Sequence, residues 1–201
     1  MKRSLISLSL LILLATVLAT SAWAGPLEDS LAADAKGDYA TELKIIRPLA
    51  VQGVDWAQYM LGTLYWVGRG VVQDDAEAVK WHRLAAAQGY EFAQTVLGLI
   101  YFEGTGVLAQ DYVEAAKWLR LAAAQGNASA QYQLGGMYSQ GQGVVQDYIR
   151  AHMWFNLAAV SGEKVAAKHR DIVASKMTSQ QIGEAQKRAR ECQARQFKNC
   201  D

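Results

Sequence analysis

Few residues in this sequence have the types and spacing that enzyme chemistry requires. Ser161 and Lys164 match the S-x-x-K spacing, in which a lysine can help to activate a serine as a nucleophile. The S-D-N and K-T-G segments that accompany this pair in penicillin-recognising enzymes do not occur in the chain. We therefore interpret the match as a coincidence, and we expect no catalytic residue.

Metal and nucleotide chemistry have no stronger support in the sequence. His82, His152 and His169 form neither an HExxH motif nor a Cys/His pair, so we expect no metal site. The Gly-x-Gly tripeptide at Gly68 and Gly70 occurs in three versions, but none completes a GxGxxG or P-loop motif. We therefore expect no cofactor, and we interpret these glycines as turn residues.

The glycines mark a unit that the chain repeats three times. The unit starts as AQYMLGTLYWVGRG, AQTVLGLIYFEGTG and AQYQLGGMYSQGQG at residues 57, 93 and 130. Corresponding residues lie 36 or 37 positions apart, a period typical of helix-turn-helix units stacked in a solenoid. In this register His82 shares its position with Leu119 and Phe155, so we interpret His82 as a half-buried packing residue.

Each unit has the signals of two helices. In the first unit, apolar residues from Ala57 to Tyr65 follow helical spacing, and the next glycines allow the chain to reverse. Asp74 is then predicted to cap a second helix, with Glu77 three residues later as in a capping box. Because this aspartate recurs in every unit, we interpret it as structural and not as a catalytic acid or base.

The combined pattern LGxxYxxGxGVxQDxxxAxxWxxxAAxxG resembles the Sel-one-like repeat, a relative of the tetratricopeptide repeat. The resemblance implies an all-α fold, a right-handed α/α superhelical solenoid that binds other proteins without chemistry of its own. Its secreted, cysteine-rich branch carries a Cys pair in the repeats, which this chain lacks. Kinship with that branch is the basis of the alternative function, a secreted hydrolase acting on β-lactam or cell-wall material.

The ends of the chain are predicted to differ from the repeats. The boundaries are residues 1–24 for a signal peptide, 25–53 for an N-terminal capping half-repeat, 54–89, 90–126 and 127–162 for three repeats, and 163–201 for C-terminal capping helices and a tail. In the last segment, Thr178 and Gln181 are predicted to form a capping box. Cys192 and Cys200 are predicted to form one disulfide in an oxidising compartment.

The first 24 residues have basic, apolar and small-residue regions in the order of an export signal. We expect cleavage after Ala24, with a retained membrane anchor as the alternative, and a periplasmic or secreted protein without stable membrane insertion. The chain has 20 Lys plus Arg and 19 Asp plus Glu. This balance gives no basic excess for nucleic acid, so we expect a protein or peptide partner and a monomer.

The candidate binding site lies where the three units differ. On the first helix of each unit, one outward-facing stripe carries large aromatic side chains in the first two units, and this aromatic run fades in the third. We expect this stripe to line the concave face and bind a partner peptide through Trp56, Tyr59, Thr63, Trp66, Phe92 and Phe102. The alternative is that part of the stripe packs against the next unit. On the first reading, the protein is a non-enzymatic scaffold or adaptor in the bacterial envelope.

Overall fold

The protein is all-helical in a computed structural model that describes residues 24–105 and 107–200. Within this part of the chain there is no strand, and the helices are α2 (Ala24–Ala35), α3 (Tyr39–Val51), α4 (Asp55–Val67), α5 (Asp75–Ala87), α6 (Glu91–Glu103), α7 (Tyr112–Ala123), α8 (Ala128–Gln140), α9 (Tyr148–Val160), α10 (Ala166–Ala174) and α11 (Ser179–Ala194). The predicted all-α solenoid is confirmed. The predicted signal peptide, except for Ala24, lies outside the described residues.

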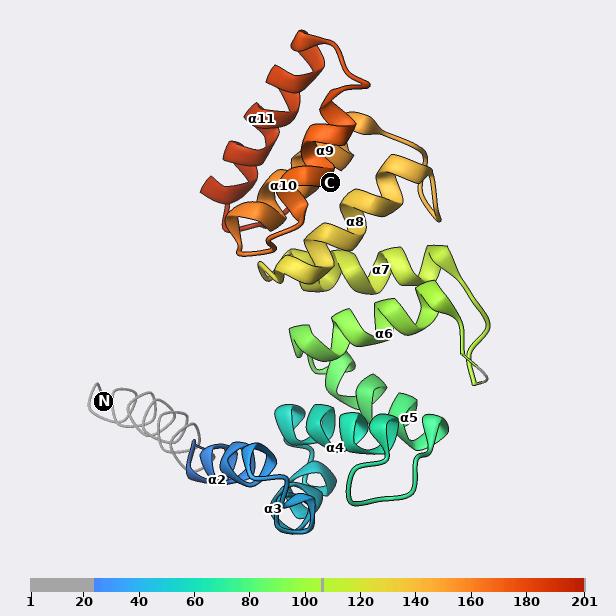
Figure 1. The fold of residues 1–201 in the computed structure, drawn as a ribbon, viewed down its shortest axis with the longest axis vertical. Helices are drawn as coiled ribbons and strands as arrows, with labels where there is room; N and C mark the ends of the chain where they lie inside the picture. Colours follow the sequence, from blue (N-terminus) through green and yellow to red (C-terminus); the bar gives the residue numbers. More distant parts are fainter. Residues whose placement is uncertain (1–23, 106, 201) are drawn as a thin grey trace, which may run out of the picture.

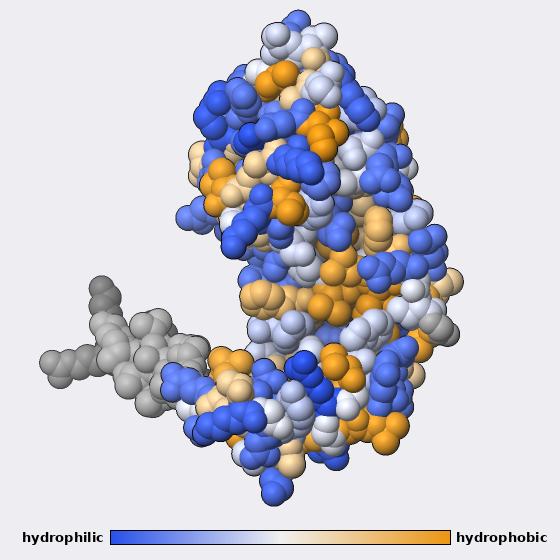
Figure 2. Space-filling view, in the orientation of Figure 1, coloured by the Kyte–Doolittle hydropathy of each residue, from blue (hydrophilic) through white to orange (hydrophobic). Residues whose placement is uncertain are grey.

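The helices stack in chain order. α4 packs on α5, α6 on α7 and α8 on α9, and each pair also contacts the next pair along the chain. Figure 1 shows the result as a curved array with α2 and α3 at one end and α10 and α11 at the other. In the space-filling view, the outline is hollowed on the side toward which both ends curve, and apolar residues gather over α6 and α7 (Figure 2).

The repeated small and apolar residues form the core. Ala78, Ala115 and Ala151 occupy one repeated position on the second helix of each unit, and all three are fully buried. Leu97 and Leu134 hold a repeated position on the first helix and are also fully buried. Because one unit cannot bury these side chains alone, the stack of units supplies the hydrophobic core.

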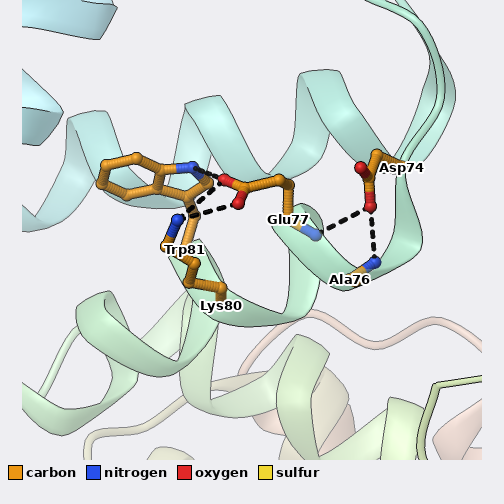
Figure 3. A network of polar contacts seen from close by, with 5 residues as sticks. All are labelled: Asp74, Ala76, Glu77, Lys80 and Trp81. Atoms are coloured by element: carbon orange, nitrogen blue, oxygen red, sulfur yellow. Dashed lines mark hydrogen bonds and ion pairs between the residues drawn. The ribbon is translucent and has the colours of Figure 1, made fainter.

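The start of α5 shows how a second helix begins. Oδ1 of Asp74 accepts hydrogen bonds from the backbone N–H groups of Ala76 and Glu77, each at 3.0 Å, which confirms the predicted N-cap (Figure 3). The capping-box prediction for Glu77 is wrong. Its carboxylate accepts hydrogen bonds from Trp81 Nε1 at 3.0 Å and Lys80 Nζ at 2.8 Å, because these donors lie one turn along the helix.

Both ends of the solenoid have their own capping structure. At the N-terminal end, Asp38 caps α3 by accepting a hydrogen bond from the Thr41 N–H. At the other end, Thr178 and Gln181 form the predicted capping box of α11. The predicted disulfide between Cys192 and Cys200 is present, with Cys192 buried on α11. The polar outer helices α10 and α11 therefore close the stack toward water.

Candidate functional site

The structure divides the six predicted binding residues into two groups. Tyr59, Thr63 and Trp66 line a pocket between α4 and α6, and Phe92 is 47% exposed near the start of α6. Trp56 and Phe102 instead pack against neighbouring helices.

Trp56 is buried, with only 9% of its surface exposed. It belongs to the cluster that contains Ile46 and Leu49 of α3 and Leu61 of α4. The prediction that Trp56 faces outward is wrong, because α4 is covered by α3 on one side and by α5 on another. A helix covered on two sides buries more than one stripe of side chains.

Phe102 is half-buried and faces the second helix of its own unit. Its ring centroid lies 5.1 Å from that of Tyr112, the first residue of α7, and it packs against the core cluster around Leu119. The alternative of packing between helices therefore applies to Phe102. Its expected outward position is wrong, because the last turn of α6 lies next to the first turn of α7.

The pocket between α4 and α6 has a volume of about 260 Å³. We call it the α4–α6 groove. Residues of α4 form one wall, residues of α6 form the other, and one residue of α5 completes the lining: Tyr59, Thr63 and Trp66, then Val96, Leu99, Ile100 and Glu103, then His82. An apolar pocket with a few polar groups is typical of a binding site.

His82 is the unusual member of this lining. It is 1% exposed, and its Nδ1 finds no hydrogen-bond partner among the described residues. Burial lowers the pKa of His82 to about 4, so the ring is neutral at pH 7. The prediction of a half-buried residue underestimated its burial and missed its place in the groove. Ile46 holds the equivalent position one unit earlier. A histidine at a position that is apolar in every other unit was the sequence signal that could have identified His82.

An aromatic cluster lies beside the groove. The ring of Tyr59 lies 5.4 Å from that of Tyr90 and 6.1 Å from that of Phe92, and the Tyr90 and Phe92 rings are 5.6 Å apart. Burial raises the pKa of Tyr90 above its ordinary value. These tilted ring contacts have the geometry that aromatic pairs prefer. Through Tyr59, the cluster connects the exposed Phe92 to the lining of the groove.

The residues that could suggest catalysis remain apart from this site. Ser161 ends α9 and Lys164 is exposed in the following loop, and neither lines the α4–α6 groove. Among the described residues, no group of three or more His, Cys, Asp or Glu side chains is placed to hold a metal ion. None of the helices in this part of the chain combines the length and apolar character that a membrane crossing requires.

The comparisons with known proteins agree with this architecture. The Sel1 repeat family model matches residues 57–90, 92–127 and 128–162. The chain belongs to the Sel1 repeat family. Sel1 repeats generally mediate interactions between proteins, and their solenoids are typically non-enzymatic.

Two crystal structures of other repeat proteins are similar to this Sel1 repeat protein. A Sel1 repeat protein from Oxalobacter formigenes is 36% identical with a TM-score of 0.61, over 65% of this chain and 97% of that one. A protective antigen with an SLR fold, present in uropathogenic Escherichia coli strains, is 29% identical with a TM-score of 0.59, over 79% of this chain but only 42% of its own. Among proteins with curated descriptions, none matches the chain.

Proposed function

We propose that this Sel1 repeat protein is a non-enzymatic scaffold of the bacterial envelope that binds a segment of a partner protein in the α4–α6 groove. The observation that carries this proposal is the groove itself. Three side chains of the outward-facing stripe that was predicted on the first helix line this groove together with apolar residues of α6: Tyr59, Thr63 and Trp66. Truncation of aromatic residues in such pockets commonly weakens protein binding by about 2 kcal/mol or more.

The envelope setting rests on two further features. Residues 1–24 have the pattern of an export signal, and Cys192 and Cys200 form a disulfide. Disulfides persist in the periplasm and outside the cell, whereas the cytosol keeps thiols reduced. A periplasmic or secreted scaffold is consistent with both features.

Trp66 and Phe102 provide a test, because one lines the groove and the other packs on Tyr112. Partners captured from envelope extract are identified, purified and titrated against the wild-type protein and each variant. We expect Trp66→Ala to weaken binding at least tenfold, as a lost anchor of about 2 kcal/mol requires, with little change in the thermal midpoint. Phe102→Ala should lower the midpoint and leave the affinity of the folded protein unchanged. Equal affinity of Trp66→Ala and wild type for every purified partner would contradict the proposal.

A further inference from the structure

Glu42 occupies a repeat position that the other units give to alanine. Asp38 caps α3 as Asp74 caps α5, and this correspondence sets the register between the half-unit and the first repeat. In that register Glu42 corresponds to Ala78, and further along the chain to Ala115 and Ala151, all fully buried. The three repeats of this chain therefore pack a small apolar residue where the half-unit has a carboxylic acid.

One oxygen of the Glu42 carboxyl group is buried without a partner. Glu42 is 2% exposed, and its Oε2 accepts no hydrogen bond from the part of the chain that the structure describes. The charged groups that face it are Asp34 of α2 and Arg69 after α4. Burial, reinforced by the charge of Asp34 and opposed by Arg69, raises the pKa of Glu42 to about 7. Such a group destabilises the fold unless something else pairs with it.

Glu42 lines a second pocket, of about 200 Å³, which we call the Glu42 pocket. Its lining is apolar along α2 and α4 and charged around Glu42: Leu31, Tyr59, Met60, Thr63 and Leu64, then Asp34, Glu42 and Arg69. Nη1 of Arg69 lies 3.7 Å from Oδ1 of Asp34, and both side chains are partly exposed. Tyr59 and Thr63 line this pocket and the α4–α6 groove, so the two sites are neighbours along α4.

We infer that the Glu42 pocket binds the ammonium group of a lysine side chain from the same partner segment that occupies the α4–α6 groove. This inference rests on the proposed function and specifies the partner: a segment with a large apolar side chain next to a lysine. The free oxygen of Glu42 and the carboxylate of Asp34 supply negative charge. The apolar wall formed by Leu31, Met60 and Leu64 suits the hydrocarbon stem of lysine.

A lysine suits the pocket better than an arginine. The guanidinium of Arg69 already lies beside the Asp34 carboxylate, with 3.7 Å between Nη1 and Oδ1, so a second, bulky guanidinium would be placed next to a like charge. An ammonium group is a compact charge with three donors, and it can pair with Glu42 from one direction. When it binds, the carboxyl group of Glu42 is expected to ionise, because a nearby opposite charge favours the charged form.

The test uses n-butylammonium, which reproduces the end of a lysine side chain. The protein is labelled with ¹³C at the glutamate carboxyl groups, the Glu42 signal is assigned by its loss in Glu42→Gln, and its pKa is measured with and without the probe. Sodium chloride at equal ionic strength and n-butylguanidinium are the comparison solutes. We expect n-butylammonium alone to lower the pKa of Glu42 by about one unit at saturation, which corresponds to tenfold tighter binding to the ionised form.

The variants make the test specific. At pH 8, where Glu42 is mostly ionised, Glu42→Gln should bind n-butylammonium about tenfold more weakly by the same linkage. Glu191→Gln, which changes an exposed carboxylate of α11, should bind it as wild type does. An unchanged pKa of Glu42, an equal change in sodium chloride, or an equal or larger change with n-butylguanidinium would overturn the inference. If the ammonium test failed but partner binding still depended on Trp66, the inference about Glu42 would fall and the proposed function would stand. If n-butylammonium lowered the pKa of Glu42 but partner binding did not depend on Trp66, the ammonium site would stand and the proposed function would fall.

Discussion

A methyl group added to Gly135 would lie 2.7 Å from Cδ1 of Phe155. The same relationship holds between Gly98 and Leu119, where the distance to Cγ is 2.7 Å, and a methyl group at Gly62 would lie 2.9 Å from Cε1 of His82. Real Cβ atoms do not approach other atoms so closely. The two helices of each unit therefore meet at a glycine, and this contact explains why the glycine recurs with the period.

Alanine substitutions at two adjacent glycines should have opposite effects. Gly135→Ala forces Phe155 out of its position, which we expect to cost about 1–3 kcal/mol of unfolding free energy. Gly136→Ala places its methyl group in open space on the same helix, so the gain in helix propensity should stabilise the protein by up to about 1 kcal/mol. Urea unfolding of both variants measures these changes. Two changes of the same sign would contradict the packing described here.

Two equivalent tryptophans should respond differently to replacement by phenylalanine. Nε1 of Trp81 donates a hydrogen bond to the Glu77 carboxylate, whereas Nε1 of Trp118 is buried and finds no acceptor in residues 24–105 and 107–200. Trp81→Phe removes a satisfied hydrogen bond, and Trp118→Phe removes an unsatisfied donor. We expect Trp81→Phe to cost about 1–2 kcal/mol more than Trp118→Phe in chemical unfolding. Equal costs would show that the Glu77 contact contributes nothing to stability.

The period, the glycine turns and the aspartate caps specified the helical units from the sequence, because each of these signals recurs in every unit. The disulfide was also accessible, since only two cysteines occur in the chain. The sequence was a weaker guide to which side chains reach the surface. Trp56 and Phe102 were placed outward on the assumption of a single buried stripe, but each first helix is covered by neighbours on more than one side.

The two most informative residues of the site are exceptions to a repeated position. His82 occupies a position that is Ile46, Leu119 or Phe155 in the other units, and Glu42 occupies a position that is alanine in the three repeats. Sequence comparison between units reveals such exceptions, yet it gives them no location. The structure adds that both side chains are buried and line neighbouring pockets that share Tyr59 and Thr63 of α4.

The C-terminal disulfide should stabilise the tail against the third repeat. A methyl group at Gly126 would lie 3.1 Å from Cε2 of Phe197, so the loop closed by Cys192 and Cys200 returns Phe197 to the junction between the second and third units. We expect Cys200→Ser to lower the free energy of unfolding by about 2–3 kcal/mol at most, because the loop is short. Dithiothreitol should lower the stability of the wild type and leave this variant unaffected. Free thiols in denatured, unreduced protein would contradict the assignment.

Glu42 should make the protein less stable as the pH rises. The folded protein holds a proton on Glu42 up to a pKa of about 7, whereas the unfolded chain loses it near 4.5. Stability from this group is therefore complete below pH 4.5 and is lost as the pH rises to 7. Glu42→Gln should remove this dependence and be more stable than wild type at pH 8, by about 1–3 kcal/mol. Parallel stability curves from pH 4.5 to 8 would refute this assignment.

His82 should act with the opposite sign in nearly the same pH window. The unfolded chain takes up a proton on this residue as the pH falls through 6.5, whereas the buried ring in the folded protein remains neutral until about pH 4. Its contribution to stability is therefore complete above pH 6.5 and is lost as the pH falls to 4, by about 3 kcal/mol at most. Leu119 fills the equivalent position against Gly98, so His82→Leu should fold and lose this acid sensitivity.

The variants at these two residues therefore predict slopes of opposite sign between pH 4.5 and 6.5. Relative to wild type, His82→Leu should gain stability as the pH falls, because only the Glu42 contribution remains of the two. Glu42→Gln should lose stability as the pH falls, because only the His82 contribution remains. Thermal or urea unfolding of wild type and both variants at several pH values measures the three slopes. If His82→Leu followed the wild-type curve throughout, the ring of His82 would have to be charged or accessible in the folded protein, and its place at the base of the α4–α6 groove would be wrong.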